Sequence, residues 1–210
     1  MNYRTGKFAS AITIVLALCS IGVLAQLGMT PFSGDMSVKS KGGQNMNGKV
    51  YFSGTKMRMD MNAEGHDVAM IHDMPGQVTY MLMPQQHMYM EMHPGQHAPM
   101  RGPKMPDLKS YDPEHPCAAE ANMTCEKVGS ETMNGRSTDK WIFKNKDSGE
   151  STTAWIDKKL HFPVKTVSSE GSEMDLTNIQ EGTPSASLFE VPSGYRKFDM
   201  GAMMGGRQSQ

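Results

Sequence analysis

The chain contains few cysteines and tryptophans and has almost no net charge. Its 210 residues include 3 Cys and 2 Trp, and 21 Lys and Arg residues stand against 22 Asp and Glu residues, so the formal net charge is −1. Without a basic cluster, the chain has no electrostatic footprint for phosphate backbones or anionic lipid head groups. We therefore exclude nucleic acid as a partner.

Sequence motifs of catalysis are also missing. Neither Gly-x-Ser-x-Gly nor His-Glu-x-x-His occurs, so the signatures of a nucleophile elbow and of a zinc protease are both absent. The carboxylates alternate with Lys and Arg along strand-like segments, as on a solvated surface. We predict a protein that is not an enzyme and that requires no cofactor.

The first 25 residues have the three parts of a secretory signal. Arg4 and Lys7 precede an apolar run over residues 8–24, and the small residue Ala25 closes it. A retained anchor needs about 20 apolar residues and usually a basic cluster after them, and residues 26–35 supply neither. We predict cleavage after Ala25, no transmembrane anchor in the mature protein, and a periplasmic or secreted location.

Removal of this leader from the 210-residue chain leaves 185 residues, of which 19 are basic and 22 acidic. This length suits one domain with a core of its own and is short for two. We expect a single domain over residues 26–200 and a disordered tail over residues 201–210.

Cysteine usage agrees with export. Cys19 leaves with the signal, and its use for lipid attachment is disfavoured by the bulky Leu18 before it. The remaining pair, Cys117 and Cys125, is expected to form a disulfide in an oxidising compartment. The competing interpretation is a zinc site with His115, but the seven residues between the two cysteines are not the close spacing of structural zinc sites.

The mature chain has apolar residues with period two, in short runs separated by Gly, Pro and Asn, which is typical of strands and turns. No long amphipathic helix is present, and short helices are expected only at residues 117–123 and 185–189. We predict a mainly β fold built from a meander of hairpins. The expected strands lie at residues 36–38, 49–52, 57–61, 68–71, 78–83, 88–92, 141–143, 152–156, 164–167 and 174–179.

This pattern stops over residues 93–116, where proline is frequent. The prolines are Pro94, Pro99, Pro103, Pro106, Pro113 and Pro116. Proline interrupts a hydrogen-bonded ladder, and a segment of this length without regular structure is usually functional or disordered. We predict a long Pro/His-rich flap between two β-rich halves.

Several segments resemble, in order, those of the DUF4412 family. They are residues 48–51, 56–59, 80–84, 88–89, 155–157, 162–165 and the closing Leu-Phe-x-x-Pro-x-Gly-Tyr of residues 188–195. That family is itself similar to the LolA-like periplasmic lipoprotein carriers. The resemblance covers residues 32–200 and implies a curled, incompletely closed antiparallel β-barrel, with short covering helices and an apolar cavity that holds acyl chains in the carriers.

Methionine is unusually frequent, with 22 residues in 210. Flexible thioether side chains can line a cavity and adapt to variable apolar ligands, although each of them also suits an ordinary core. We therefore predict a non-enzymatic binding protein for a lipid, an acyl chain or another amphipathic ligand, with a possible envelope protein as partner. The expected cavity residues are Met57, Met59, Met61, Met81, Met83, Met88, Met90, Met92, Trp141 and Trp155.

Copper binding is the alternative. Thioethers and imidazoles are ligands that suit Cu(I). The candidate ligands are His87, Met88, Met92, His93, His97 and Met100. Alternate residues of a strand are about 7 Å apart, so the flap would have to contribute His97 or Met100.

Export and disulfide formation can be tested together. The mature protein from the cell envelope is expected to begin near Gln26 and to contain no free thiol, which intact-mass measurement with and without alkylation would show. Detection of residues 1–25, or of two alkylated cysteines without prior reduction, would contradict the prediction.

A Cys125→Ser variant should stay folded but lose about 2–3 kcal/mol of stability, because so short a loop restricts the unfolded chain modestly.

Overall fold

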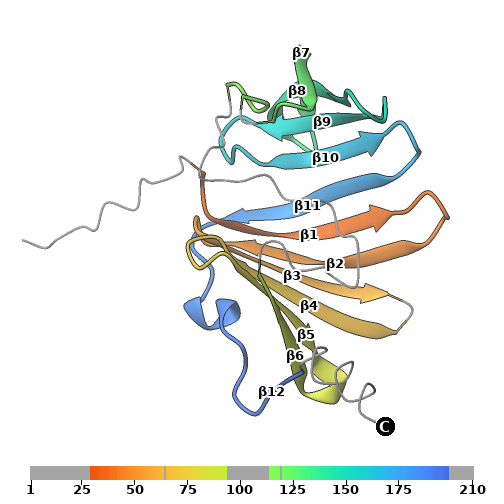
Figure 1. Ribbon diagram of the computed structural model, residues 1–210. Coiled ribbons are helices and arrows are strands. Elements are labelled where there is room, and N and C mark those ends of the chain that lie inside the picture. Colours follow the sequence, from red (N-terminus) through yellow and green to blue (C-terminus); the bar gives the residue numbers. More distant parts are fainter. Residues whose placement is uncertain (1–28, 64, 94–113, 119, 199–210) are drawn as a thin grey trace, which may run out of the picture.

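The structure is a computed structural model that describes residues 29–63, 65–93, 114–118 and 120–198 (Figure 1). These residues form one sheet and two short 3-10 helices, η1 (Pro84–Gln86) and η2 (Ala186–Phe189). The strands are β1 (Phe32–Lys39), β2 (Asn45–Phe52), β3 (Lys56–Ala63), β4 (His66–Asp73), β5 (Val78–Met83), β6 (Met88–Met92), β7 (Met123–Met133), β8 (Arg136–Asn145), β9 (Ser151–Asp157), β10 (Pro163–Ser168), β11 (Glu173–Glu181) and β12 (Arg196–Lys197).

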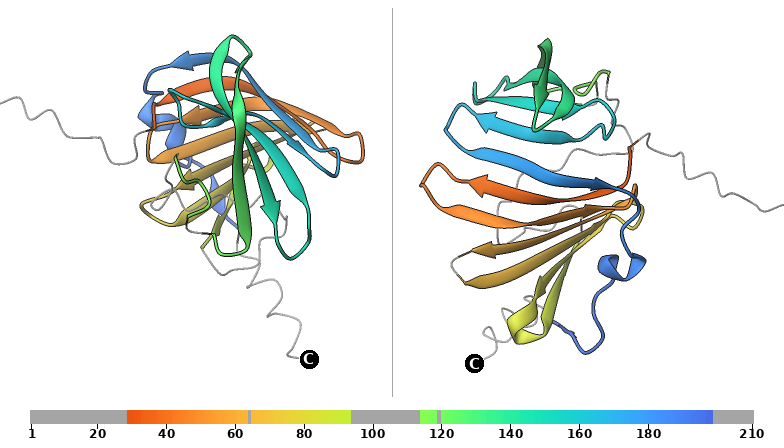
Figure 2. Two further views of the ribbon diagram at one scale, coloured as in Figure 1. Left: turned by 90° about the horizontal axis from the view of Figure 1, so that it is seen from above. Right: turned by 180° about the vertical axis from the view of Figure 1, so that it is seen from behind.

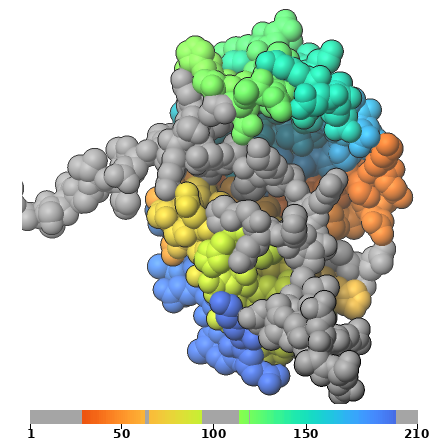
Figure 3. Space-filling model, viewed as in Figure 1, coloured from red at the N-terminus to blue at the C-terminus, as the bar shows by residue number. Residues whose placement is uncertain are grey.

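The sheet has the order β12-β6-β5-β4-β3-β2-β1-β11-β10-β9-β8-β7 and does not close on itself. Two views related by rotation show its strong curl (Figure 2). Its strands pair antiparallel, except that the two-residue β12 pairs parallel with β6 at one edge, where the two segments lie side by side in Figure 3. The predicted mainly β, curled and incompletely closed architecture is confirmed.

Two meanders meet in the middle of this sheet. β1 pairs with β2 on one side and with β11 on the other. The chain therefore leaves one meander at β6, starts the other at the far edge with β7, and returns through β11 to the first strand. Within the described part of the chain, no helix is long and apolar enough to cross a membrane.

Local sequence sets the hairpin turns. Asn134 and Gly135, between β7 and β8, both have positive φ, at 52° and 75°, which is the combination that a two-residue type I′ turn requires. After β4, the backbone N–H of Gly76 donates to Asp73 at 2.9 Å, and Gln77 takes a left-handed φ of 50°. Turns of this kind fix the register of the strands that they join.

Two clusters fill the main part of the core. The larger one is centred on Phe32, Phe52, Leu160 and Leu176, all of them fully buried. The second lies on the opposite face of β4 and β5, where η2 and the chain after it pack against the sheet. It contains Ala69, Ile71, Leu82 and Phe189, with Tyr51, Tyr80, Tyr89, Leu188, Val191 and Tyr195 around them.

A polar cluster links β8 to its neighbour β9 and also to β11, which is not its neighbour. Arg136 of β8 forms ion pairs with Asp157 of β9 and Glu181 of β11, the latter at 2.9 Å. Asp157 is only 2% exposed, and its carboxylate also accepts the backbone N–H groups of Lys159 and Leu160 at 2.8 and 2.7 Å. The guanidinium reaches Glu181 at the end of β11, beyond the residues of β11 that pair with β10.

Two expectations for local structure differ in outcome. The short helix expected at residues 185–189 is present as η2. The prediction of a helix at residues 117–123 was wrong. The described residues of this segment form turns, and Met123 already belongs to β7, where it pairs with Asn145. A helix of two turns has little stability of its own, whereas the strand gains a hydrogen-bonded partner.

The sequence pattern also missed β7. As an edge strand it is mostly exposed and polar, so it has no apolar alternation to reveal it. The predicted disulfide is present between Cys117 and Cys125, whose Cα atoms are 5.9 Å apart, and it attaches the segment before β7 to that strand. The predicted signal, the tail and residues 94–113 of the flap lie outside the described residues.

The Asp157 cluster predicts a specific loss of stability in acid. Burial raises the pKa of Asp157. The Arg136 guanidinium and two backbone N–H groups together lower it by more than burial raises it, so the net pKa lies below its ordinary value of 3.8. Since the folded-state pKa is the lower one, the contribution to stability is complete above about pH 5 and is lost as the pH falls through that lowered pKa. Asp157→Asn should cost about 2–4 kcal/mol at pH 7, because it leaves Arg136 without its buried partner.

Urea unfolding at pH 7 and at pH 3 measures this difference, which should shrink at the lower pH. Lys41→Ala is the matched control, because its ion pair with Glu170, at 3.2 Å, is largely exposed. The control should lose less than about 0.5 kcal/mol. An equally small loss for Asp157→Asn at pH 7 would contradict the role assigned to the cluster.

Candidate functional site

Cross-strand pairing aligns methionines of four neighbouring strands in one row. Met59 of β3 pairs with Met70 of β4, Met70 with Met81 of β5, and Met81 with Met90 of β6. Directly opposed residues of antiparallel strands share a face, and their Cβ atoms are about 4.5–5.5 Å apart. The four thioethers therefore lie side by side across the sheet, and we call them the methionine row.

The rows on either side of it are also rich in methionine. Phe52, Met57, His72, Thr79 and Met92 follow one another across β2 to β6 on one side. The pairs Met61–Val68 and Met83–Met88 lie on the other side. We call this surface the methionine face. Its members are Met57, Met59, Met61, Val68, Met70, His72, Thr79, Met81, Met83, Met88, Met90 and Met92.

Most of this face is only partly buried. Met57 and Met81 are 2% and 5% exposed and belong to the core, whereas its other methionines are intermediate between buried and exposed. The face is continuous with the core, because Met57 pairs with Phe52, which in turn pairs with Phe32. The result is an apolar surface of flexible side chains that extends outward from the core.

Met70 is the member of the row that sequence reasoning missed. Its neighbours Ala69 and Ile71 are also apolar, so no alternation marks it. The structure explains this composition, because Ala69 and Ile71 point to the opposite face and pack against Phe189 of η2. β4 is therefore apolar on both faces, and only the pairing with Met59 and Met81 places Met70 in the row.

His72 is the titratable side chain of the methionine face. Its Nδ1 lies 2.8 Å from the hydroxyl of Thr79 on the neighbouring strand. Burial lowers the pKa of His72 below its ordinary value of 6.5, and Asp73 opposes this effect only in part. Burial therefore favours the neutral form of the imidazole on this apolar surface.

The structure does not bring the two candidate tryptophans together. Trp141 pairs with Ala154, whereas Trp155 pairs with Lys140, so the two indoles point to opposite faces of β8 and β9. They also belong to different core clusters. Trp155 donates its indole N–H to Glu131 at 2.6 Å. A single surface cannot include both rings.

The described members of the copper set are also divided between the two faces. The His87 ring packs edge-on against Tyr195, with ring centres 5.7 Å apart, beside the cluster on the far face of the sheet. His93 pairs with Glu91 at 2.8 Å, whereas Met92 is on the methionine face. His97 and Met100 lie outside the described residues. Within those residues, no three His, Cys, Asp or Glu side chains are placed to hold a metal ion.

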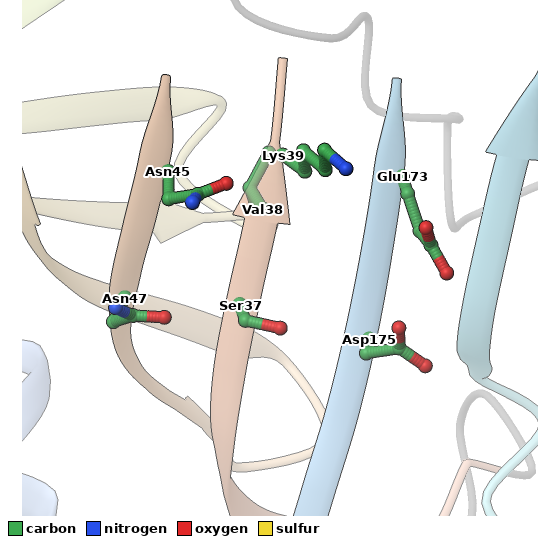
Figure 4. A pocket seen from close by; sticks show the side chains of 7 residues that line it. All are labelled: Ser37, Val38, Lys39, Asn45, Asn47, Glu173 and Asp175. Carbon is green, nitrogen blue, oxygen red and sulfur yellow. The ribbon is translucent and has the colours of Figure 1, made fainter. Parts of the chain in front are cut away.

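A polar groove of about 300 Å³ runs over the ends of β1, β2 and β11 (Figure 4). Its lining residues are Ser37, Val38, Lys39, Asn45, Asn47, Glu173 and Asp175. Lys165 forms ion pairs with both carboxylates, at 3.0 Å in the case of Asp175, and it holds the pKa of Glu173 below its usual value. Carboxylates that are already held in ion pairs are poorly suited to general acid–base catalysis.

Comparison with solved structures finds relatives of this fold at low sequence identity. An uncharacterized conserved protein from Thermus thermophilus is 10% identical over 83% of this chain and 95% of that chain, with a TM-score of 0.56. MucB is 14% identical over 81% of this chain, with a TM-score of 0.51, and this chain spans about 60% of its length. The Pseudomonas aeruginosa MucA/MucB complex is also among the matches, with a TM-score of 0.50 and 12% identity over 80% of this chain and 59% of that chain.

A weaker overlap, with a TM-score of 0.37 and 9% identity, is found with the LolA superfamily protein NE2245 from Nitrosomonas europaea, over 80% of this chain and 95% of that chain. No curated protein matches. The family model described as "Domain of unknown function (DUF4412)" matches residues 32–161 and 144–195. Because these segments span most of the chain, the resemblance in the sequence is confirmed, and the protein belongs to the DUF4412 family.

Proposed function

We propose that this protein acts outside the cytoplasm as a non-enzymatic binding protein, and that it holds a lipid or acyl chain on the methionine face. The observation that carries the proposal is the methionine row, in which Met59, Met70, Met81 and Met90 stand side by side on four strands. Three of the four are only partly buried, so apolar surface remains for a ligand to cover.

Energetics favour such a ligand. Covering apolar surface contributes about 25 cal/mol per Å², so a chain laid along these strands gains affinity from burial alone. Unbranched thioether side chains have three soft torsions and adapt to ligands of different shape. A face of this kind suits a flexible acyl chain better than a rigid ligand that needs directional hydrogen bonds.

The far side of the same strands supports the assignment. There the chain covers its own apolar surface, since η2 and the residues after it pack on Ala69, Ile71 and Leu82. The methionine face has a similar apolar character on the same strands, and among the described residues most of its methionines are only partly buried. We infer that this second apolar surface serves a ligand.

A protein partner belongs to the proposal as well. The matched structures include MucB in complex with MucA, so this fold occurs in a protein that binds another protein. We propose that the present chain exchanges its ligand with, or signals its occupancy to, a protein of the cell envelope.

The proposal is tested by charge placed in the middle of the methionine row. Met70→Lys should weaken binding of a fluorescent fatty acid at least about tenfold, because an ammonium group in an apolar site must lose hydration without a partner. Met70→Leu should bind nearly as the wild type does, since a volume-conserving apolar exchange costs under about 1.5 kcal/mol. Fluorescence titration measures both affinities.

Ser37→Lys is the matched control, because Ser37 is exposed on the polar face of β1. It introduces the same charge and should leave fatty-acid affinity unchanged. Thermal unfolding of each variant shows whether it is folded. Unchanged affinity in a folded Met70→Lys variant, or no binding by the wild type, would refute the proposal.

A further inference from the structure

His72 has methionines at the neighbouring positions on its face of the sheet. Met57 is directly opposite it on β3, and Met70 precedes it by two residues on the same face of β4. Met59 and Met81 pair with Met70 on either side, which makes them diagonal neighbours of His72. Direct and diagonal neighbours in a sheet have backbone separations of about 4.5–8 Å, and flexible thioether side chains span such distances.

The imidazole is held in one orientation. Its Nδ1 is engaged by Thr79 at 2.8 Å, which leaves Nε2 as the nitrogen available to a ligand. Within the part of the chain that the structure describes, no hydrogen bond or ion pair involves Nε2. Protein histidines that bind metals usually have the other ring nitrogen hydrogen-bonded in this way, which sets the tautomer and the orientation of the ring.

The chemistry of the neighbouring side chains also suits a soft metal. The nearest carboxylate along the chain, Asp73, is engaged by Lys56 at 2.9 Å. Thioether sulfur is a soft ligand and imidazole nitrogen also suits copper, so this set favours Cu(I) over hard cations such as Mg²⁺ or Ca²⁺.

We infer that His72 is the centre of a soft-metal site, in which its Nε2 and thioethers from the surrounding Met57, Met59, Met70 and Met81 bind one monovalent copper ion. This site differs from the copper set expected from the sequence, since it uses none of the histidines around the flap. The copper site is also independent of the lipid-binding proposal. Its Cu(I) affinity is measured without any acyl ligand, so either proposal can fail while the other stands.

The test is an anaerobic titration of the full mature chain with Cu(I) against a chromophoric Cu(I) chelator. The wild type should take up one ion, and X-ray absorption should show both nitrogen and sulfur neighbours. His72→Ala should lower the affinity by more than about 100-fold. Thr79→Val removes only the group that orients the ring and should lower it about 10- to 100-fold, as losses of such supporting groups usually do.

Methionine variants separate ligation from packing. Met57→Leu and Met81→Leu conserve volume and should leave the protein folded with little change in its thermal unfolding, yet each should weaken Cu(I) binding. His87→Ala is the control, because that ring packs on Tyr195 away from the methionine face. It should bind as the wild type does.

Three results would overturn the inference. They are no uptake of Cu(I) by the wild type, unchanged affinity in a folded His72→Ala variant, and loss of binding in a His93→Ala/His97→Ala variant with His72 intact. Circular dichroism and thermal unfolding establish which variants are folded. If His72→Ala fails to fold, the Thr79→Val and Met57→Leu variants carry the test, and wild-type affinity in both would equally overturn it.

Discussion

One buried carboxylate ties together the end of the sheet that lies beside the core. Asp157 is almost inaccessible to water, so its charge requires donors, and the protein supplies Arg136 and two backbone N–H groups. Arg136 then reaches Glu181, which is paired with Phe32 on β11 and β1. This contact links strands that are three apart in the sheet order, and it lies on the side to which the core residue Phe32 points. The polar cluster thereby fixes the ends of these strands beside the apolar core from which the methionine face continues.

The two faces of β4 and β5 show how the same strands serve stability and binding. One face is sealed by Phe189 and the residues around it, and it anchors the C-terminal part of the chain. The other carries the methionine row, whose members grade from buried Met81 to partly exposed Met59, Met70 and Met90. Because thioethers are unbranched and polarisable, this surface can be apolar without being rigidly packed. An acyl chain would use the flexibility and apolar area of these side chains, whereas a soft metal ion would use their polarisable sulfur.

His72 marks where these two uses diverge. A lipid requires only the area and flexibility of the surrounding side chains, so leucine can replace methionine there at little cost. A copper ion requires sulfur and an oriented nitrogen, and the Thr79 hydroxyl supplies the orientation. Methionine-to-leucine exchanges on this face therefore distinguish the two ligand classes within one set of variants.

The sequence by itself determined the class of fold, most of the strands, the disulfide and the family, because period-two alternation, turn residues and the closing motif of residues 188–195 are local signals. It also indicated that Met57, Met59 and Met61 share a face. Only the tertiary structure decided that Met70 completes the row, that Trp141 and Trp155 point to opposite faces, and that His72 lies among the thioethers. These facts depend on register between strands, which hairpin geometry and the pairing of β1 with β11 set across the whole sheet. The sequence also failed to predict the polar edge strand β7. This strand is held by its pairing with β8 and has no apolar pattern of its own.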